Sequence, residues 1–518
     1  MYCRLLRKLG LAALVLFPTL LQSVAAQELE VIFPSRPVPA NPLGNGYNVA
    51  FFERGMSAAL TDPSAGAALC AALRQVHTTS LRYPGGSFTY WYPHRREGLQ
   101  AFKRAGFAEQ SYNLWFPDKY GWAEPEAFFS FCRQAGLTAW YELNPAYLYD
   151  AGADTIGQLC PLPRYTTQHD VVLDPDRYLP RALEHAKDLA RTCMRQGVDV
   201  VWEVGNEDYV YFEPEGYAAV AAAFIKAIRE VSPTARFALC GDSESWDTRT
   251  WQMAMLRALR EEGIESFDYS SVHCYLTGVG EFDAAGDWHP LPRSNGRELL
   301  SSTIRAWQLI RNMYLGDFRK ILDDAGYSDT ALALTEFNPV HPGHLGDAAQ
   351  KALEHCMGRA LGEAAIYPFV IEDCGALFSH DLVRSGEGAT FFRRLDYTPA
   401  GKDTYGLPLE ARVMGLVAPH AAGEVLHKDW SGICVSAHSW GLYLTVANPD
   451  EQERSFSLLV HDLPAVHRAV LERVSASDLS VADYPYEYHS GSGPVPEEGK
   501  VTLHVPPCSL TALALLCR

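Results

Sequence analysis

The sequence predicts an α/β protein in which a (β/α)8 TIM barrel is followed by a C-terminal antiparallel β-sandwich. Two observations indicate this fold. Over residues 45–398, short apolar runs alternate with longer helical patterns, as expected of parallel strands joined by helices. Over residues 399–518, helical patterns nearly vanish, and short alternating runs are separated by Gly, Pro, Asp and Asn, which is typical of a small sandwich.

Eight apolar runs qualify as barrel strands, the number that closes a (β/α)8 barrel. They are residues 47–52, 80–83, 138–143, 198–204, 236–240, 269–274, 331–334 and 365–371. The helical patterns between them are residues 124–135, 178–196, 216–231, 249–262, 297–325 and 348–364. Sandwich strands are expected at residues 432–437, 440–447, 455–460, 469–474 and 500–505, and residues 27–44 are expected to add an N-terminal strand.

Residues 1–26 have the layout of a secretory signal peptide. Three basic residues precede an apolar run over residues 9–21, and Ser23-Val24-Ala25-Ala26 supplies small residues for cleavage. The run is shorter than the ~20 residues of a membrane-spanning helix, and no later stretch approaches that length. We therefore expect a secreted or periplasmic chain without a membrane span once the leader is removed. An uncleaved anchor is the alternative.

Composition weighs against a nucleic-acid partner. The chain has 62 Asp and Glu against 44 Lys and Arg, a formal net charge of -18. Because phosphate binding needs clustered basic side chains, this balance favours neutral partners such as sugars. The 12 cysteines show neither a C-x-x-C pair nor a metal-type spacing. We expect the protein to use no metal and no organic cofactor. Cys508 and Cys517 are a candidate disulfide, while isolated buried thiols are expected for most cysteines.

Two glutamates follow apolar runs. Glu207 ends the segment Trp202-Glu203-Val204-Gly205-Asn206-Glu207, and Glu336 lies in Ala333-Leu334-Thr335-Glu336-Phe337-Asn338. Because the carboxyl ends of barrel strands surround one cleft, we expect both carboxyl groups to face it. Hydrolysis of a glycosidic bond needs such a pair, one group to protonate the leaving oxygen and one to attack the sugar or activate water. A helix cap or turn is the alternative for Glu207.

Other predicted strand ends also carry polar side chains that suit a sugar site. They are Glu53, Arg82, Asn144, Asn206, His273 and Tyr275. A cation such as Arg82 or a phenol such as Tyr275 would keep a neighbouring carboxylate ionised. The amide of Asn206 would hydrogen-bond a sugar hydroxyl. Taken singly, Glu53 is equally a partner in an ion pair at the rim, and His273 a buried core histidine.

In these motifs the chain resembles the clan A glycoside hydrolases, most nearly the family 51 α-L-arabinofuranosidases and next the family 79 β-glucuronidases and heparanase-like enzymes. The matching segments are Arg82-Tyr83-Pro84-Gly85-Gly86, Gly205-Asn206-Glu207 and His273-Cys274-Tyr275. The resemblance implies that Glu207 is the general acid/base and Glu336 the nucleophile of a retaining enzyme. It also implies that Asn206 binds the hydroxyl beside the anomeric carbon, that Tyr275 holds the nucleophile, and that Glu53 and Asn144 contact the glycone.

The chain departs from the family around the sugar. Thr335-Glu336-Phe337 stands where Asp-Glu-Trp is usual, and Asp208-Tyr209 follows Glu207; an exposed Asp208 would disfavour an anionic sugar. The expected function is a retaining glycosidase that removes a terminal, α-L-arabinofuranoside-like sugar from plant or microbial polysaccharide or oligosaccharide. The alternatives are an endo-acting polysaccharidase, a β-glucuronidase-like clan A hydrolase, and a non-catalytic carbohydrate-binding protein.

Overall fold

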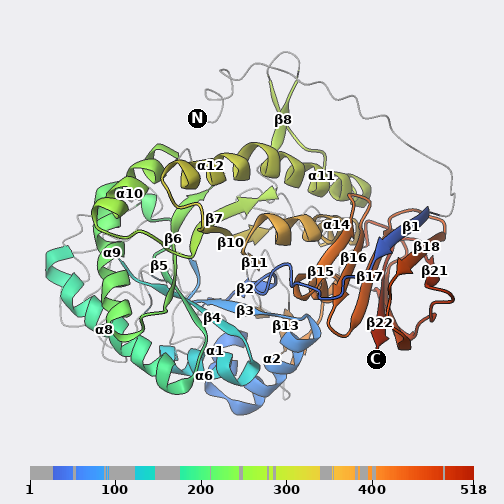
Figure 1. Cartoon of the computed structure of the whole chain (residues 1–518), viewed down its shortest axis with the longest axis horizontal. Helices are drawn as coiled ribbons and strands as arrows, with labels where there is room; N and C mark the ends of the chain where they lie inside the picture. Colours follow the sequence, from blue (N-terminus) through green and yellow to red (C-terminus); the bar gives the residue numbers. More distant parts are fainter. Residues whose placement is uncertain are drawn as a thin grey trace.

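The structure is a computed structural model in which a barrel and a sandwich lie side by side (Figure 1). It describes residues 27–50, 54–86, 89, 92, 123–145, 175–210, 212–243, 249–276, 279–283, 287–338, 353, 355–379, 383–385, 395–398, 404–481 and 485–518. The expected leader over residues 1–26 lies outside these ranges. Among the described helices, none combines the length and the apolar character needed to cross a membrane.

Eight parallel strands close the barrel, as the sequence predicts. In chain order they are β2 (Gly46–Asn48), β3 (Ser80–Tyr83), β4 (Thr138–Leu143), β5 (Val200–Val204), β6 (Arg236–Ser243), β7 (Tyr269–Tyr275), β10 (Ala331–Asn338) and β11 (Ala376–Ser379). Near the first residues of the strands, an apolar layer fills the interior, and there the ring of Trp140 packs edge-on against Phe378. Because side chains two apart on a strand point the same way, Glu142 follows Trp140 into the interior and lies nearer the carboxyl ends.

The predicted eighth strand is wrong. Residues 365–371 lie inside α14 (Met357–Asp373), and the eighth strand is β11, which begins after that helix. Every residue of α14 from Met357 to Ile371 is buried, because the helix lies between the barrel and the sandwich. A helix that is buried on all sides has a continuous apolar sequence. Periodicity cannot distinguish such a sequence from that of a buried strand.

Helices cover the outside of the barrel (Figure 1). They are α1 (Arg54–Thr61), α2 (Pro63–Gln75), α6 (Pro125–Ala135), α8 (Pro175–Gln196), α9 (Pro214–Val231), α10 (Arg249–Glu261), α11 (Gly296–Leu309) and α12 (Gly316–Asp324), with a π-helical segment, Ile310–Leu315, joining the last two. Their ends follow local rules. Asp62 caps α2 by accepting from the backbone N–H groups of Ser64 and Ala65, and Gly136 ends α6 in the left-handed conformation.

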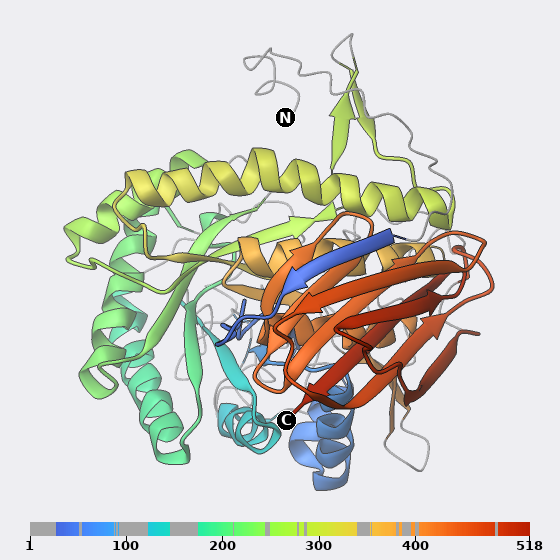
Figure 2. The same cartoon turned by 45° about the vertical axis from the view of Figure 1, so that its right-hand side comes forward.

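The C-terminal region forms two sheets that enclose a second core. One sheet has the order β15-β16-β17-β22-β19-β20, and the other β1-β18-β21. The strands are β1 (Gln27–Ile32), β15 (Glu424–Lys428), β16 (Ile433–His438), β17 (Gly441–Asn448), β18 (Arg454–His461), β19 (Val466–Ser475), β20 (Glu487–Ser492), β21 (Lys500–Val505) and β22 (Ser509–Cys517). Figure 2 shows the N-terminal strand β1 beside the C-terminal strands, where it pairs in parallel with β18.

The candidate disulfide is also wrong. Cys508 and Cys517 are both free thiols. Cys508 immediately precedes β22 and Cys517 is its last residue, so the 9-residue strand separates them. At ~3.3 Å per residue, an extended strand holds such positions ~30 Å apart, whereas a disulfide needs Cα atoms within ~7 Å. The other cysteines of the described ranges are free and buried.

Candidate active site

A buried arginine lies at the centre of the candidate site. Arg82, at the end of β3, is fully buried and donates through Nε and Nη2 to the two carboxylate oxygens of Glu203, at 2.6 and 3.1 Å. Its Nη2 lies 2.8 Å from Oε1 of Glu142, and its Nη1 lies 3.5 Å from Oε1 of Glu336. One guanidinium thus joins carboxyl groups from β4, β5 and β10.

Two amide side chains also accept from Arg82. Nη1 donates to Oδ1 of Asn48 at 2.8 Å, and Nη2 donates to Oδ1 of Asn206 at 2.7 Å. Because a guanidinium can only donate, each amide must turn its oxygen toward Arg82, which directs the NH2 group of Asn206 away from it. Asn206 therefore presents a donor, the group that a sugar hydroxyl oxygen requires.

Glu142 and Glu203 were not among the residues predicted for the site. Glu203 also accepts from Nε1 of Trp140 at 2.7 Å and from the Ser271 hydroxyl at 2.6 Å. Glu142 accepts from the backbone N–H groups of Gly85 and Gly86, at 2.7 and 3.1 Å. The sequence does contain a signal for them, since each is an acid inside an apolar strand that alternation turns toward the barrel interior.

The charges of this cluster perturb one another. Burial alone opposes the charge on Arg82, but the carboxylates of Glu142, Glu203 and Glu336 more than offset it, so the arginine pKa is raised. Burial raises the pKa of Glu142 to about 8, with Glu203 and Glu336 adding to the rise and Arg82 opposing it. Glu142 therefore carries a proton at neutral pH.

A bulge in β10 directs Glu336 into the site. The pairing of β10 with β7 shifts register between Leu334 and Glu336, so the strict alternation of side chains is broken there. The Glu336 side chain is 9% exposed, and the Tyr275 hydroxyl donates to its Oε2. A Cβ on Gly86 would lie 2.8 Å from Oε1 of Glu336, so only glycine leaves room for the carboxylate.

Glu207 lies beyond β5 on a left-handed backbone, with φ of 51°. Its side chain is 27% exposed, three times the fraction of Glu336. The Tyr209 hydroxyl donates to its Oε1 at 2.9 Å, and Nδ1 of His273 lies 3.0 Å from the same oxygen. The more exposed carboxyl group is thus held by two hydrogen-bonding side chains.

His273 lies between the two carboxyl groups. Its Nδ1 is 3.0 Å from Oε1 of Glu207 and 3.5 Å from Oε2 of Glu336. Burial alone would lower the histidine pKa, but Glu336 and Glu207 outweigh it and raise the pKa to about 9. The imidazole is therefore protonated at neutral pH, and its Nδ1 carries a hydrogen that either carboxylate accepts.

No protein-family model matches the chain. It is 22% identical over 205 residues to the intracellular exo-α-(1→5)-L-arabinofuranosidase of Streptomyces lividans, a match that spans 39% of the chain and 28% of that relative's length. The α-L-arabinofuranosidase from Thermotoga maritima, solved as an arabinose complex, aligns with a TM-score of 0.61 and 14% identity, over 93% of this chain and 98% of the other.

A second solved structure is similar to nearly the whole chain. The family 51 arabinofuranosidase from Xanthomonas axonopodis pv. citri aligns with a TM-score of 0.60 and 16% identity, over 94% of this chain and 99% of the other. The chain has the fold of the family 51 arabinofuranosidases. In a barrel of this type the loops after the strands form the active site, and the cluster around Glu207 and Glu336 lies at that end.

The remaining predicted residues of this family 51-like chain are placed as follows. Asn144 directly follows β4 and is buried, and Glu53 lies outside the described residues. The interpretation of Asp208 as an exposed acid is wrong, since this side chain is completely buried. The backbone N–H of Asp208 donates to Sγ of Cys240, and a Cβ on Gly205 would collide with the Asp208 carboxylate. Packing thus keeps Asp208 beneath the site, where it does not face a sugar.

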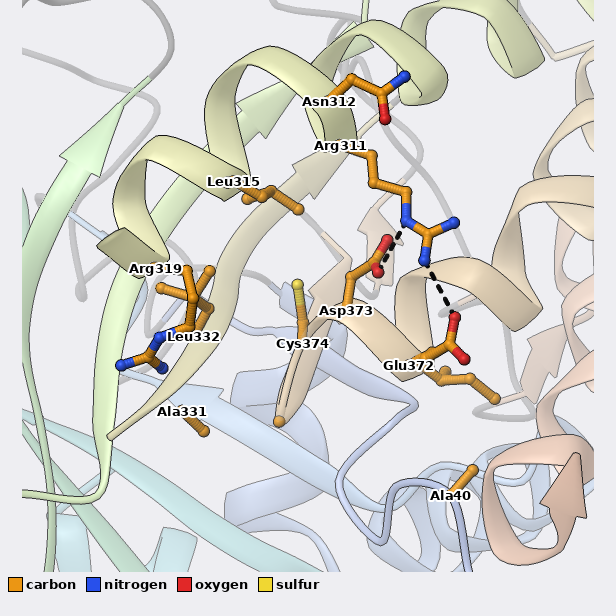
Figure 3. A pocket seen from close by; sticks show the side chains of 13 residues that line it. Ala40, Arg311, Asn312, Leu315, Arg319, Ala331, Leu332, Glu372, Asp373 and Cys374 are labelled. Carbon is orange, nitrogen blue, oxygen red and sulfur yellow. Dashed lines mark hydrogen bonds and ion pairs between the residues drawn. The ribbon is translucent and has the colours of Figure 1, made fainter. Parts of the chain in front are cut away.

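Two hollows of the described residues lie at opposite ends of the barrel. The smaller is beside Glu207 and is lined by Glu203, Asn206, Glu207, Tyr209, Cys240, Gly241, Ser271 and His273. The larger lies where β10 begins and α14 ends, and Figure 3 shows Arg311 there, paired with Asp373 and Glu372. The acids of the candidate site lie at the other end, beside the smaller hollow, so the larger hollow is not part of the candidate site.

Proposed function

We propose that this protein is a retaining glycoside hydrolase that removes a terminal α-L-arabinofuranoside-like sugar, with Glu336 as nucleophile and Glu207 as general acid/base. One observation carries the proposal. Nδ1 of His273 lies within 3.5 Å of a carboxylate oxygen of both Glu207 and Glu336. A pair of acids so close, at the carboxyl ends of barrel strands, is what double displacement at a sugar carbon requires.

The same distances support retention over inversion. The two oxygens can be no farther apart than the sum of their distances to Nδ1, 3.0 and 3.5 Å. That upper bound only reaches the lower limit of the separations of inverting enzymes, roughly 6.5–9.5 Å, and comfortably includes the ~5 Å of retaining enzymes. The bound therefore fits the spacing of retaining enzymes better than that of inverting enzymes, which must hold a water between the acids.

The surroundings of the two acids support their different roles. Glu336 is nearly buried, lies beside the Arg82 cation and accepts from Tyr275, and both contacts favour the ionised form that a nucleophile needs. Glu207 is more exposed, as a group that exchanges protons with a leaving oxygen and then with water should be. In the proposed cycle, Glu336 attacks the anomeric carbon while Glu207 protonates the leaving oxygen. Glu207 then takes a proton from the water that releases the sugar.

The choice of sugar is supported by the relatives. The Streptomyces lividans relative and the aligned structures are named as arabinofuranosidases, and the NH2 group of Asn206 offers a neutral donor for a hydroxyl group. The cluster has four carboxyl groups, those of Glu142, Glu203, Glu207 and Glu336, around two cations, Arg82 and His273. Both cations are already paired with carboxylates of this cluster, so neither is left to bind the carboxylate of a uronic acid, and a neutral glycone is favoured.

Export is a separate part of the proposal. It rests on the signal-peptide pattern of residues 1–26, whereas the Streptomyces lividans relative is an intracellular enzyme. Expression of the whole chain in a bacterial host, followed by fractionation and N-terminal sequencing, tests it. A mature protein beginning near residue 27 outside the cytoplasm is expected, and an intact N-terminus in the cytoplasm would contradict export.

The catalytic proposal is tested by a screen of aryl glycosides of α-L-arabinofuranose, β-glucuronic acid, β-glucose, β-galactose and β-xylose. We expect release from the arabinofuranoside by the native chain and a loss of at least about 10⁴-fold in Glu336→Ala. Glu230→Ala, which removes an exposed carboxylate from α9, is the matched control and should keep full activity. Parental activity in a folded Glu336→Ala variant would refute the nucleophile assignment. If none of the five glycosides is hydrolysed but a polysaccharide is cleaved, the endo-acting alternative would be favoured.

A further inference from the structure

Tyr209 stands two residues after Glu207 and reaches back to the same carboxyl group. Its hydroxyl donates to Oε1 of Glu207 at 2.9 Å, and Nδ1 of His273 lies 3.0 Å from that oxygen. We propose that Tyr209 is a positioning residue that, with His273, keeps Oε1 of Glu207 as an acceptor, so that the proton delivered to the substrate is carried on Oε2. This inference rests on the proposed acid/base role of Glu207.

The backbone around Glu207 explains how Tyr209 reaches it. Glu207 has a positive φ of 51°, and the next three residues form a 3₁₀ turn, Asp208–Val210. The N–H of Val210 donates to the carbonyl of Glu207 at 3.0 Å, which folds the chain back over the glutamate. On one side the turn is anchored by the bond from the Asp208 N–H to Sγ of Cys240, at 3.2 Å.

The ring of Tyr209 is held from the other side by α10. It packs edge-on against Trp251, with ring centroids 6.2 Å apart and an angle of 83° between the planes. The indole N–H of Trp251 donates to the carbonyl of Phe212 at 2.8 Å, which ties the tryptophan to the chain just beyond the turn. The phenol is thus fixed in position before any substrate binds, as a positioning role requires.

The number of lone pairs decides which oxygen carries the proton. A carboxyl oxygen offers about two acceptor sites. At Oε1 of Glu207, the Tyr209 hydroxyl and Nδ1 of His273 occupy both. His273 is protonated at neutral pH, because its pKa is raised to about 9, so its Nδ1 is a donor. A proton on Oε1 would have to displace one of these donors, and the proton of the acid form therefore resides on Oε2.

The arrangement has a kinetic consequence. A phenol that donates to a carboxylate stabilises its ionised form, which favours the second step, in which Glu207 acts as a base. Without the Tyr209 hydroxyl, the proton of the acid form should be distributed over both oxygens of Glu207. The carboxyl group should also hold this proton more tightly. Substrates whose leaving group needs protonation should suffer most, and the alkaline limb of the pH–rate profile should move upward.

The test is Tyr209→Phe in the full chain, assayed with phenyl and 2,4-dinitrophenyl glycosides of the sugar found in the screen. We expect kcat/KM to fall about tenfold for the phenyl glycoside and less than about threefold for the dinitrophenyl glycoside, whose leaving group departs without a proton. The alkaline limb of kcat/KM should move up by about half a pH unit. Equal losses on both substrates with an unmoved limb would overturn the inference.

A matched control separates positioning from general damage. Tyr217→Phe removes another buried hydroxyl nearby, one that donates to the carbonyl of Val204 at 2.7 Å and does not bond Glu207. Tyr217→Phe should change kcat/KM by the same factor for the phenyl and the dinitrophenyl glycosides. In a Glu207→Ala background, adding Tyr209→Phe should cause no further loss on the dinitrophenyl glycoside, because Tyr209 acts through Glu207. A further loss there would mean that Tyr209 acts independently, and would also overturn the inference.

The Glu207→Ala variant distinguishes failure of this inference from failure of the proposed function. If Glu207 is the acid/base, Glu207→Ala retains far more activity on the dinitrophenyl than on the phenyl glycoside. Should Glu207→Ala lack that pattern, the proposed function is wrong, and the inference falls with it. Should Glu207→Ala show the pattern and Tyr209→Phe lack it, only the role of Tyr209 is wrong.

Discussion

At the scale of single residues, the two acids that flank Arg82 should respond differently to the same substitution. Glu203 accepts hydrogen bonds from Nε and Nη2 of Arg82. It also accepts from the indole of Trp140 and the hydroxyl of Ser271. Glu203→Gln removes this carboxylate and should lower the free energy of unfolding by ~3 kcal/mol, as when a buried ion pair is broken. Glu142, whose pKa is raised to about 8, is already neutral at pH 6, so Glu142→Gln should cost only ~1 kcal/mol.

Urea unfolding of both variants at pH 6 checks this difference. The matched pair has the same change of atoms at two buried positions of neighbouring strands, β4 and β5. Equal losses of unfolding free energy would show that Glu142 carries a full charge in the native protein, contrary to its raised pKa.

A second residue-scale prediction concerns His273 and pH. Its pKa is 6.5 in an unperturbed histidine and about 9 in the folded site, so the native state holds an extra proton between these values. The stability from this group is fully present below pH 6.5 and is lost as pH rises through 9. We expect His273→Gln to lack this part of the pH dependence. Unfolding free energies of both proteins at pH 6, 7.5 and 9.5 measure it, and parallel curves would contradict it.

At the scale of elements, the turn after β3 and the bulge in β10 together place the nucleophile. Gly86 has φ of 58° and would set a Cβ 2.8 Å from Oε1 of Glu336, whereas Gly136, with φ of 73°, has nothing within 4 Å of its Cβ. Both substitutions by alanine incur the same left-handed backbone cost, ~1 kcal/mol. Gly86→Ala should in addition lower kcat/KM about 100-fold, because it displaces the Glu336 carboxylate.

Gly136→Ala is thus the control for Gly86→Ala. Thermal unfolding and steady-state kinetics of the two variants separate backbone strain from displacement of the carboxylate. If both variants lose stability and both keep activity, the close approach of Gly86 to Glu336 does not matter for turnover.

At the scale of the whole molecule, the barrel and the sandwich are joined through α14. Phe369 of α14 stacks on Trp430 beside β15, with ring centroids 3.6 Å apart, and Arg311 and Lys428 lie over the Phe369 ring. Arg311 and Lys428 also pair with Glu372, so apolar and ionic contacts meet at one junction. The two parts should therefore unfold in a single transition.

Trp430→Ala tests this junction. We expect the free energy of unfolding to fall by ~3 kcal/mol and the midpoint temperature of the single transition to decrease, because a large aromatic contact is removed. Trp440→Ala, at a residue 38% exposed between β16 and β17, is the control and should cost less than ~1 kcal/mol. Calorimetry measures both, and two separate transitions in the native chain would contradict coupling through α14.

The sequence by itself determined the barrel, the sandwich and the strand ends where the polar groups gather, because alternation of apolar strands with amphipathic helices is a local property. Only the tertiary structure decided that residues 365–371 are helical, since what buries α14 on all sides is the sandwich packed against the barrel. The bulge that turns Glu336 inward and the meeting of Glu142, Glu203 and Asn206 on Arg82 are likewise tertiary. They depend on closure of the barrel, which brings together side chains that are far apart in the chain and carry no local signal of their partners.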